Sequence, residues 1–378
     1  MASNPLRELA QCGQSVWIDS ISRQMLRSGT LKRLIDEDGI TGVTANPTIF
    51  EKAITQSHDY DDTIRKIGSG GASPMQVYEA LAVEDVGAAA DLLRPVYDRV
   101  DRRDGFVSIE VSPDIAHDTK ASIEEACRFW TRLHRPNVFI KIPATPAGIP
   151  AIEHLIGEGI NINITLIFAV EVHEQVMDAF LKGLEHRVAQ NQPIDHIASV
   201  ASFFVSRVDT LVDQLLEEKA KEADEERNKE LKSLEGKAAV ANAKIAYQRF
   251  QKVFSSDRFK ALEQKGAQLQ RPLWASTSTK NPNYPDTMYV TPLIGPNTVN
   301  TMPMETIDAV RDHGEVQCGT IMQGLDEAFQ VMKDLERVGI SMKAVTDQLT
   351  EEGVEKFSNS LHSLLDAIEQ QQRSLVRA

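Results

Sequence analysis

The stretch Asn137–Thr145, NVFIKIPAT, decides the fold. Aliphatic residues alternate in it with Phe139 and Lys141, which predicts a β-strand that carries these two side chains on one face. Because Pro143 cannot donate a hydrogen bond to a sheet, the strand should end near it. Burial disfavours the charged form of a lysine. Lys141 is therefore either a nucleophilic amine that forms Schiff bases with carbonyl compounds or a side chain that extends from the strand end into solvent.

Seven further strands are predicted on either side of this stretch, and helical segments separate them. The predicted strands are Val16–Asp19, Gly42–Asn46, Phe106–Val111, Asn161–Phe168, His196–Val205, Leu273–Ser278 and Thr287–Leu293. Short strands that alternate with helices along the whole chain are typical of an α/β fold, the (β/α)8 TIM barrel.

The sequence contains no linker rich in Gly, Pro or Ser, so we expect one domain over residues 1–378. Residues 208–265 are predicted to be an inserted, mostly helical segment. Its middle, residues 217–237, is dense in charges of both signs, which is typical of a solvated helical surface. Residues 303–378 are predicted to form three helices that pack on the barrel.

The composition excludes several classes of partner. The 378 residues carry a net charge of −14, which argues against nucleic acid but leaves room for a small cationic cluster that binds one phosphate group. No apolar stretch is long enough to span a membrane, and the first residues lack the pattern of a secretory signal. We therefore expect a cytoplasmic protein without a membrane partner. The sequence leaves open whether it is a monomer or a homodimer.

The cysteines and histidines give no sign of a metal site. The three cysteines, Cys12, Cys127 and Cys318, are far apart and odd in number, which suits a reducing compartment better than a disulfide framework. The nine histidines show neither HExxH nor the spacing of a zinc site. We expect no metal and no other cofactor.

Polar residues lie at or near the ends of six predicted strands, on the face opposite to the branched aliphatic residues. They are Asp19, Asn46, Glu110, Lys141, Thr165 and Ser202. One inward polar residue is often a hydrogen-bonded core group. Six of them, at the barrel end where active sites lie, indicate a catalytic site.

Amine catalysis on a carbonyl compound fits this set. Lys141 would attack a ketone, and the resulting iminium would accept the electrons of the adjacent C–C bond as it breaks. Asp19 and Glu110, in different surroundings, would divide the acid and base steps. Asn163 and Asn46 suit several sugar hydroxyls, and Arg207, just past the sixth strand, offers a guanidinium fork for a phosphate.

Five motifs resemble those of the transaldolases, the Schiff-base transferases of the pentose phosphate pathway. The motif around Lys141 is IKIPATPAG, the motif around Asn46 is GVTANPTIF, and SIEV, NITLIF and SFFVSRVD match further blocks. The similarity covers nearly the whole chain. The length and the charged helical segment resemble the larger bacterial and plant-type subgroup, whose barrel is of the class I aldolase type.

The resemblance implies a role for each residue that matches the family pattern. Lys141 would form the Schiff base, Asp19 would act at the cleaved bond, and Glu110 with Thr165 would activate a catalytic water. The substrate-binding residues would be Asn46, Asn163, Ser202, Phe204 and Arg207. The sequence departs from the family pattern after the seventh strand, where it has Ser276 and Lys280 instead of a second arginine. Lys280 is our substitute for the phosphate role.

Three functions remain open from the sequence. The first is a transaldolase that moves a dihydroxyacetone unit from sedoheptulose 7-phosphate or fructose 6-phosphate to glyceraldehyde 3-phosphate or erythrose 4-phosphate. The second is an aldolase that releases dihydroxyacetone from fructose 6-phosphate. The third is an inactive sugar-phosphate sensor or scaffold. The presence of Asp19, Glu110 and Lys141 argues against it, because an inactive barrel has no physical reason to keep a buried amine between two carboxylates.

Overall fold

Eight parallel strands close into a barrel in the computed structural model, which describes residues 4–377 and their side chains up to residue 374. The strands follow chain order around the barrel, and the last pairs with the first. They are β1 (Gln14–Ile18), β2 (Gly42–Val43), β3 (Phe106–Glu110), β4 (Val138–Pro143), β5 (Ile162–Ile167), β6 (Ser199–Phe204), β7 (Gln270–Ala275) and β8 (Thr298–Met302). The predicted (β/α)8 fold is confirmed.

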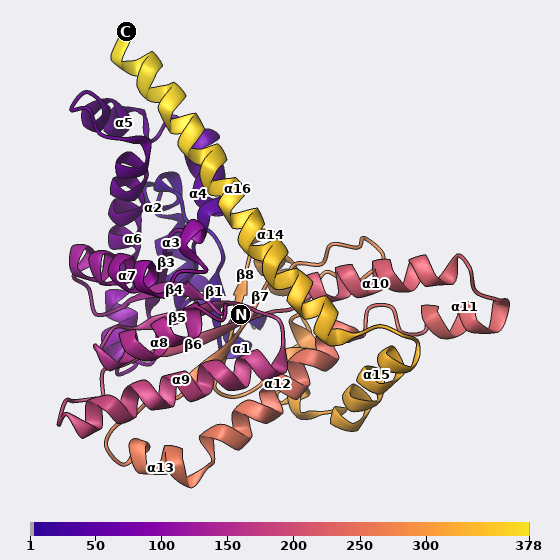
Figure 1. The fold of residues 1–378 in the computed structure, drawn as a ribbon. Coiled ribbons are helices and arrows are strands. Elements are labelled where there is room, and N and C mark those ends of the chain that lie inside the picture. The colour runs from indigo at the N-terminus through magenta and orange to yellow at the C-terminus, as the bar shows by residue number, and fades with distance from the viewer. Residues whose placement is uncertain (1–3, 378) are drawn as a thin grey trace.

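Helices surround the barrel (Figure 1). The first half of the chain forms α1 (Pro5–Gln11), α2 (Arg23–Arg27), α3 (Thr30–Arg33), the π-helix η1 (Leu34–Asp38), α4 (Pro47–Thr55), α5 (Asp61–Gly68), α6 (Pro74–Arg99), the 3-10 helix η2 (Pro113–Ile115), α7 (Thr119–Leu133), α8 (Gly148–Gly157) and α9 (Val170–Ala189). The second half forms α10 (Ser206–Ala220), α11 (Glu225–Lys232), α12 (Ala238–Phe254), α13 (Asp257–Glu263), the 3-10 helices η3 (Thr291–Leu293) and η4 (Thr320–Met322), α14 (Met304–His313), α15 (Leu325–Arg337) and α16 (Met342–Arg377). Within the described residues, no helix is long and apolar enough to cross a membrane.

The prediction of an eighth strand over Thr287–Leu293 is wrong. This segment forms a turn that leads into η3. Pro292 lies in η3 and has no N–H to donate to a neighbouring strand. The true strand, β8, follows this segment at Thr298–Met302, and it pairs with β1 and β7. Its pattern of Thr, Val and Asn is less apolar than the segment before it, so hydrophobicity alone selects the wrong segment.

Aromatic side chains fill the barrel below the strand ends. The ring of Phe139 on β4 stacks against Phe106 with centroids 4.3 Å apart, and it lies 6.1 Å from Trp17 on β1. A Cβ atom on Gly42 of β2 would lie 2.4 Å from the Trp17 ring, so only glycine fits there. Because side chains alternate along β4, Phe139 packs in the barrel and Lys141, two residues on, reaches the next layer towards the mouth.

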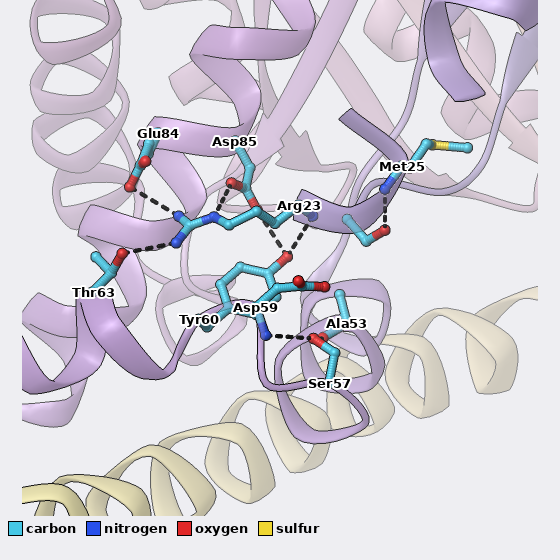
Figure 2. Close-up of polar contacts among 10 residues, drawn as sticks. Arg23, Met25, Ala53, Ser57, Asp59, Tyr60, Thr63, Glu84 and Asp85 are labelled. Atoms are coloured by element: carbon cyan, nitrogen blue, oxygen red, sulfur yellow. Dashed lines mark hydrogen bonds and ion pairs between the residues drawn. The ribbon is translucent and has the colours of Figure 1, made fainter. Parts of the chain in front are cut away.

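A buried arginine joins the helices that follow β1 and β2 (Figure 2). Arg23 on α2 pairs with Asp85 at 3.2 Å and with Glu84 at 2.8 Å, both on α6, and donates to the Thr63 hydroxyl on α5 at 2.8 Å. The Tyr60 hydroxyl donates to Asp85 at 2.8 Å and accepts from the backbone N–H of Arg23 at 2.9 Å. Each buried polar group of this network has a partner, so the network fixes α2, α5 and α6 against each other.

Helix α16 lies along one side of the barrel mouth (Figure 1). It packs against β5 and α10 near its beginning, against η2 and α4 further along, and against α5 and α6 towards its end. The Ser360 hydroxyl lies 2.8 Å from that of Thr48 on α4, and Gln372 donates to the carbonyl of Ala72 at 3.0 Å. The last helix of the chain is therefore attached to loops that follow several different strands.

Two of the three cysteines are paired. Cys12, at the end of α1, and Cys318, in the loop before η4, form a disulfide with Cα atoms 5.0 Å apart. The expectation of unpaired cysteines is wrong for these two, because the chain after α14 returns to α1 and separation in sequence does not reveal that return. Cys127 is a free, half-buried thiol.

Candidate active site

Lys141 and Glu110 form an ion pair inside the barrel mouth. The parallel register of β3 and β4 sets these residues side by side, and the lysine Nζ lies 3.2 Å from the Glu110 Oε2. Lys141 Nζ also donates to the carbonyl of Ala45 at 3.2 Å. Both side chains are only 4% exposed. The structure thus excludes the solvent-extended lysine, because the ammonium group stays within the barrel.

Asp19 follows β1 directly and is held by a pair of threonines. The hydroxyl of Thr44 donates to Asp19 Oδ1 at 2.6 Å and lies 2.6 Å from the hydroxyl of Thr301 on β8. The backbone N–H of Asp19 donates to the carbonyl of Met302 at 2.8 Å. The carboxyl is thus fixed in orientation between β2 and β8.

Burial dominates the electrostatics of both carboxyl groups. It raises the pKa of Asp19, against the opposing effects of the Thr44 hydrogen bond and of the positive charges of Lys141 and Arg207. It also raises the pKa of Glu110, against the neighbouring Lys141 ammonium. Each carboxyl group therefore holds a proton more readily than in water, as a general acid requires.

Thr165 lies on β5, two residues after Asn163. In the register it is opposite Pro143 on β4, two residues beyond the pair formed by Lys141 and Asn163. Its hydroxyl is buried and has no hydrogen-bond partner within the described residues. The strand is irregular at this point, since the pairing with β6 shifts between Ile164 and Ile167, and a β-bulge of this kind re-aims side chains.

Asn163 and Ser202 belong to one buried hydrogen-bond chain. The Asn163 amide donates to the Ser108 hydroxyl at 2.9 Å and accepts from the Ser202 hydroxyl at 2.7 Å. These three side chains come from β5, β3 and β6, and all are buried. The chain fixes the Asn163 side chain and leaves one of its two amide hydrogens for a further acceptor.

Asn46 lies beyond the end of β2, because that strand is shorter than predicted. Its side-chain oxygen accepts from the backbone N–H of Ile49 at 2.9 Å and so caps α4. This capping role was not predicted from the sequence. A cap uses the amide oxygen only, so the amide nitrogen remains a free donor at the barrel mouth.

Arg207 lies in the first turn of α10, after β6. Its guanidinium carbon is 5.2 Å from the Phe204 ring centroid and 5.8 Å from that of Phe357 on α16. Burial lowers its pKa, against the attraction of Asp19 and Glu110. It forms no ion pair within the described part of the chain. Asp209 is not its partner, because that carboxyl group accepts from the Tyr289 hydroxyl at 3.0 Å and from a backbone N–H.

The loop after β7 places Ser276 and Lys280 differently. The Ser276 hydroxyl lies 2.9 Å from that of Ser206, and its backbone has a left-handed φ of 56°. Lys280 is exposed, and its ammonium donates to the Ser278 hydroxyl at 2.6 Å. Ser276 therefore joins the loops after β6 and β7, while Lys280 lies on the rim.

Four residues of the site escaped the sequence analysis as site residues. Thr44 and Ser108 share the inward faces of their strands with predicted residues, so the same alternation could have identified them. Thr301 was missed because its strand was misplaced. Phe357 gave no local signal: its ring centroid lies 6.0 Å from Lys141 Nζ, yet it belongs to an amphipathic helix at the far end of the chain.

The site offers no constellation for a metal. Within residues 4–374, no group of three or more His, Cys, Asp or Glu side chains is placed to hold an ion. The chemistry available is that of an amine, two carboxyl groups with raised pKa values, and neutral hydrogen-bonding side chains.

The chain is similar to known transaldolases over nearly its whole length. A family model described as Transaldolase/Fructose-6-phosphate aldolase matches residues 16–368. A transaldolase of Trichodesmium erythraeum is 47% identical over 378 residues and covers 99% of each chain. Transaldolases of Thermobifida fusca and Acidothermus cellulolyticus are 48% and 49% identical, over 97% and 100% of this chain and 98% of each relative.

Proposed function

Since this chain belongs to the transaldolase/fructose-6-phosphate aldolase family, we propose that its transaldolase activity, which makes it a transferase, depends on a Schiff base formed by Lys141. The observation that carries the proposal is the buried pair of Lys141 and Glu110 at 3.2 Å. Transfer of a proton from the ammonium to the carboxylate yields a neutral amine beside a carboxylic acid, which are the two groups that attack on a ketone requires.

The donor is a ketose phosphate. The Lys141 amine adds to its carbonyl carbon, Glu110 gives a proton to the carbonyl oxygen, and loss of water from the carbinolamine leaves an iminium. Asp19 then takes the proton of the hydroxyl group on the fourth carbon, and the bond between the third and fourth carbons breaks. The bond's electrons move into the iminium to give an enamine, and an aldose phosphate leaves.

The second half of the cycle reverses these steps with another aldose phosphate. The enamine carbon attacks the aldehyde, Asp19 returns its proton to the new hydroxyl group, and water then hydrolyses the iminium to free Lys141. We propose that Glu110 and Thr165 hold that water, because the Thr165 hydroxyl is buried without a partner and Glu110 is the nearest base to Lys141.

Neutral groups would bind the dihydroxyacetone unit. The free amide hydrogen of Asn163, fixed by Ser108 and Ser202, and the free amide of Asn46 both suit sugar hydroxyls. Phe204 would pack beneath the guanidinium of Arg207, and Ser276 would keep the two rim loops together.

The phosphate group would be held by Arg207 with help from Lys280. An arginine without an ion pair, in a chain of net charge −14, is available for an anionic ligand. Sugar phosphates are thus the proposed partners. We propose a cytoplasmic location. A monomer and a homodimer both fit a site built from one chain.

An assay with and without an acceptor separates the proposal from its nearest alternative. Fructose 6-phosphate with erythrose 4-phosphate should give rapid formation of glyceraldehyde 3-phosphate. Fructose 6-phosphate alone should give dihydroxyacetone much more slowly. Equal rates under both conditions would identify an aldolase instead.

A further inference from the structure

One face of α16 is turned towards the substrate site. A Cβ on Gly353 would lie 2.8 Å from Leu166 on β5 and 3.6 Å from a guanidinium nitrogen of Arg207. Four residues later, the Phe357 ring contacts the cationic groups of both Lys141 and Arg207. Residues four apart share a helix face, so Gly353 and Phe357 define the stripe that covers the barrel mouth.

Lys356 borders this stripe, because it follows Gly353 by three positions and precedes Phe357 by one. It is near enough to Arg207, Lys280 and Lys52 for their charges to act on its ammonium group. The side chain is exposed on the helix surface, and the partial burial of its ammonium, followed by these three like charges, lowers its pKa. Lys356 on α16 thus lies within electrostatic reach of three other cations, Arg207 on α10, Lys280 in the loop after β7 and Lys52 on α4.

The carboxylates nearby form no ion pairs with these cations. Glu51, Glu352 and Glu355 line the same surface depression as Lys356, but none forms an ion pair with it. Glu352 instead accepts from the amide of Gln348 at 2.7 Å. Among the described residues, Lys356 has no carboxylate partner, and neither has Lys280 or Arg207. Asp19, Glu110 and Glu352 act on Arg207 only from beyond ion-pair distance. The hydrogen-bond donors of the three cations are therefore open to an anionic ligand.

We propose that Lys356 binds the substrate phosphate together with Arg207 and Lys280, so that the last helix of the chain completes the phosphate site. The proposal rests on the sugar-phosphate transfer proposed above. A dianionic phosphate ester relieves the repulsion among the three cations and accepts hydrogen bonds from each. Because Phe357 adjoins Lys356, the same contact holds the aromatic ring over Lys141 when phosphorylated sugar is bound.

The test compares Lys356→Gln with Lys356→Arg and with a control on the same helix. Lys343→Gln serves as the control, since Lys343 is exposed and pairs with Asp347. For each variant, kcat/KM is measured with fructose 6-phosphate and with unphosphorylated fructose, and inorganic phosphate is tested as a competitive inhibitor.

We expect Lys356→Gln to lower the ratio of the two efficiencies by about tenfold and to raise the inhibition constant of phosphate by a similar factor, as for loss of one charge-assisted hydrogen bond near the surface. Lys356→Arg should keep the efficiency ratio and the inhibition constant of phosphate close to their wild-type values. Lys343→Gln should match the wild type in both quantities. An unchanged ratio and inhibition constant in Lys356→Gln would overturn the proposal.

Failure of this proposal is distinct from failure of the function on which it rests. Borohydride reduction of the wild type and Lys356→Gln with dihydroxyacetone, which carries no phosphate, should label Lys141 in both. If Lys141 is labelled in both proteins and the ratio of kcat/KM for fructose 6-phosphate to that for fructose is unchanged, only the role of Lys356 is rejected. No labelling in the wild type would reject the Schiff base as well.

Discussion

The ammonium of Lys141 on the fourth strand lies 6.0 Å from the ring of Phe357 on the last helix. Lys141 is therefore covered by a residue from the last helix, far along the chain. This contact explains why a barrel-mouth lysine is only 4% exposed, and it makes α16 part of the site.

Lys141→Ala should abolish activity and leave the fold intact. The substitution deletes the nucleophile, so kcat should fall by about a thousandfold or more. The Glu110 carboxyl group, which then has no cationic partner, already has a raised pKa and can remain protonated. Circular dichroism and thermal unfolding should stay close to wild type, and retention of more than a tenth of the activity would exclude Lys141 as the nucleophile.

Asp19→Ala and Glu110→Ala should fail at different steps. Without Asp19 the Schiff base should still form, but the C–C bond should not break. Without Glu110 the formation of the Schiff base should itself become slow, because the amine loses its proton acceptor at 3.2 Å. Single-turnover borohydride trapping measures that step directly, and equal trapping rates in the two variants would contradict this division of roles.

Arg207→Ala should weaken the binding of phosphorylated substrates selectively. Loss of a charged hydrogen-bond donor weakens the binding free energy by about 2–3 kcal/mol. KM for fructose 6-phosphate should therefore rise by roughly fiftyfold. The reaction with unphosphorylated fructose should change by less than about threefold. If both substrates lose efficiency by one common factor, Arg207 supports the loop after β6 and does not bind phosphate.

Asp209→Asn should alter the pH dependence of stability. Burial raises the pKa of Asp209 from its ordinary 3.8 to about 7. Its contribution to the free energy of unfolding is thus fully present below pH 3.8 and is lost as the pH rises through 7. The wild type should therefore lose up to about 4 kcal/mol more than Asp209→Asn between pH 4 and pH 8. Urea unfolding at several pH values measures this, and parallel profiles would contradict the assignment.

Replacement of residues 217–237 by a short turn should leave the chemistry intact. Leu231 and Leu234 in this segment are buried, and Glu230 pairs with Arg337 of α15, so the melting temperature should fall. Turnover of the folded protein should stay within about tenfold, roughly 1.4 kcal/mol of barrier. A loss of several orders of magnitude would mean that the segment acts on the site.

Residues on strands were more predictable from sequence than residues brought in by helices. Period-two alternation identified Glu110, Lys141, Asn163, Thr165 and Ser202 as inward groups, because the parallel register leaves no freedom once the barrel closes. It failed for β8, where an apolar segment interrupted by Pro292 was preferred to a polar strand. It also extended β2 too far and so missed that Asn46 caps α4.

The features that could not be predicted from the sequence depend on tertiary contacts. The pairing of Cys12 with Cys318, and the placement of Phe357 and Lys356 beside Arg207, depend on where distant segments return to the barrel. Helical periodicity predicts that α16 has an apolar face, but it does not say which strand ends that face covers.

Borohydride reduction in the presence of fructose 6-phosphate, followed by peptide mass spectrometry, tests the central claim most directly. A covalent adduct should appear on the peptide that contains Lys141, at near one equivalent per chain, and it should be absent from Lys141→Ala. An adduct on another lysine, or none under turnover conditions, would contradict the account.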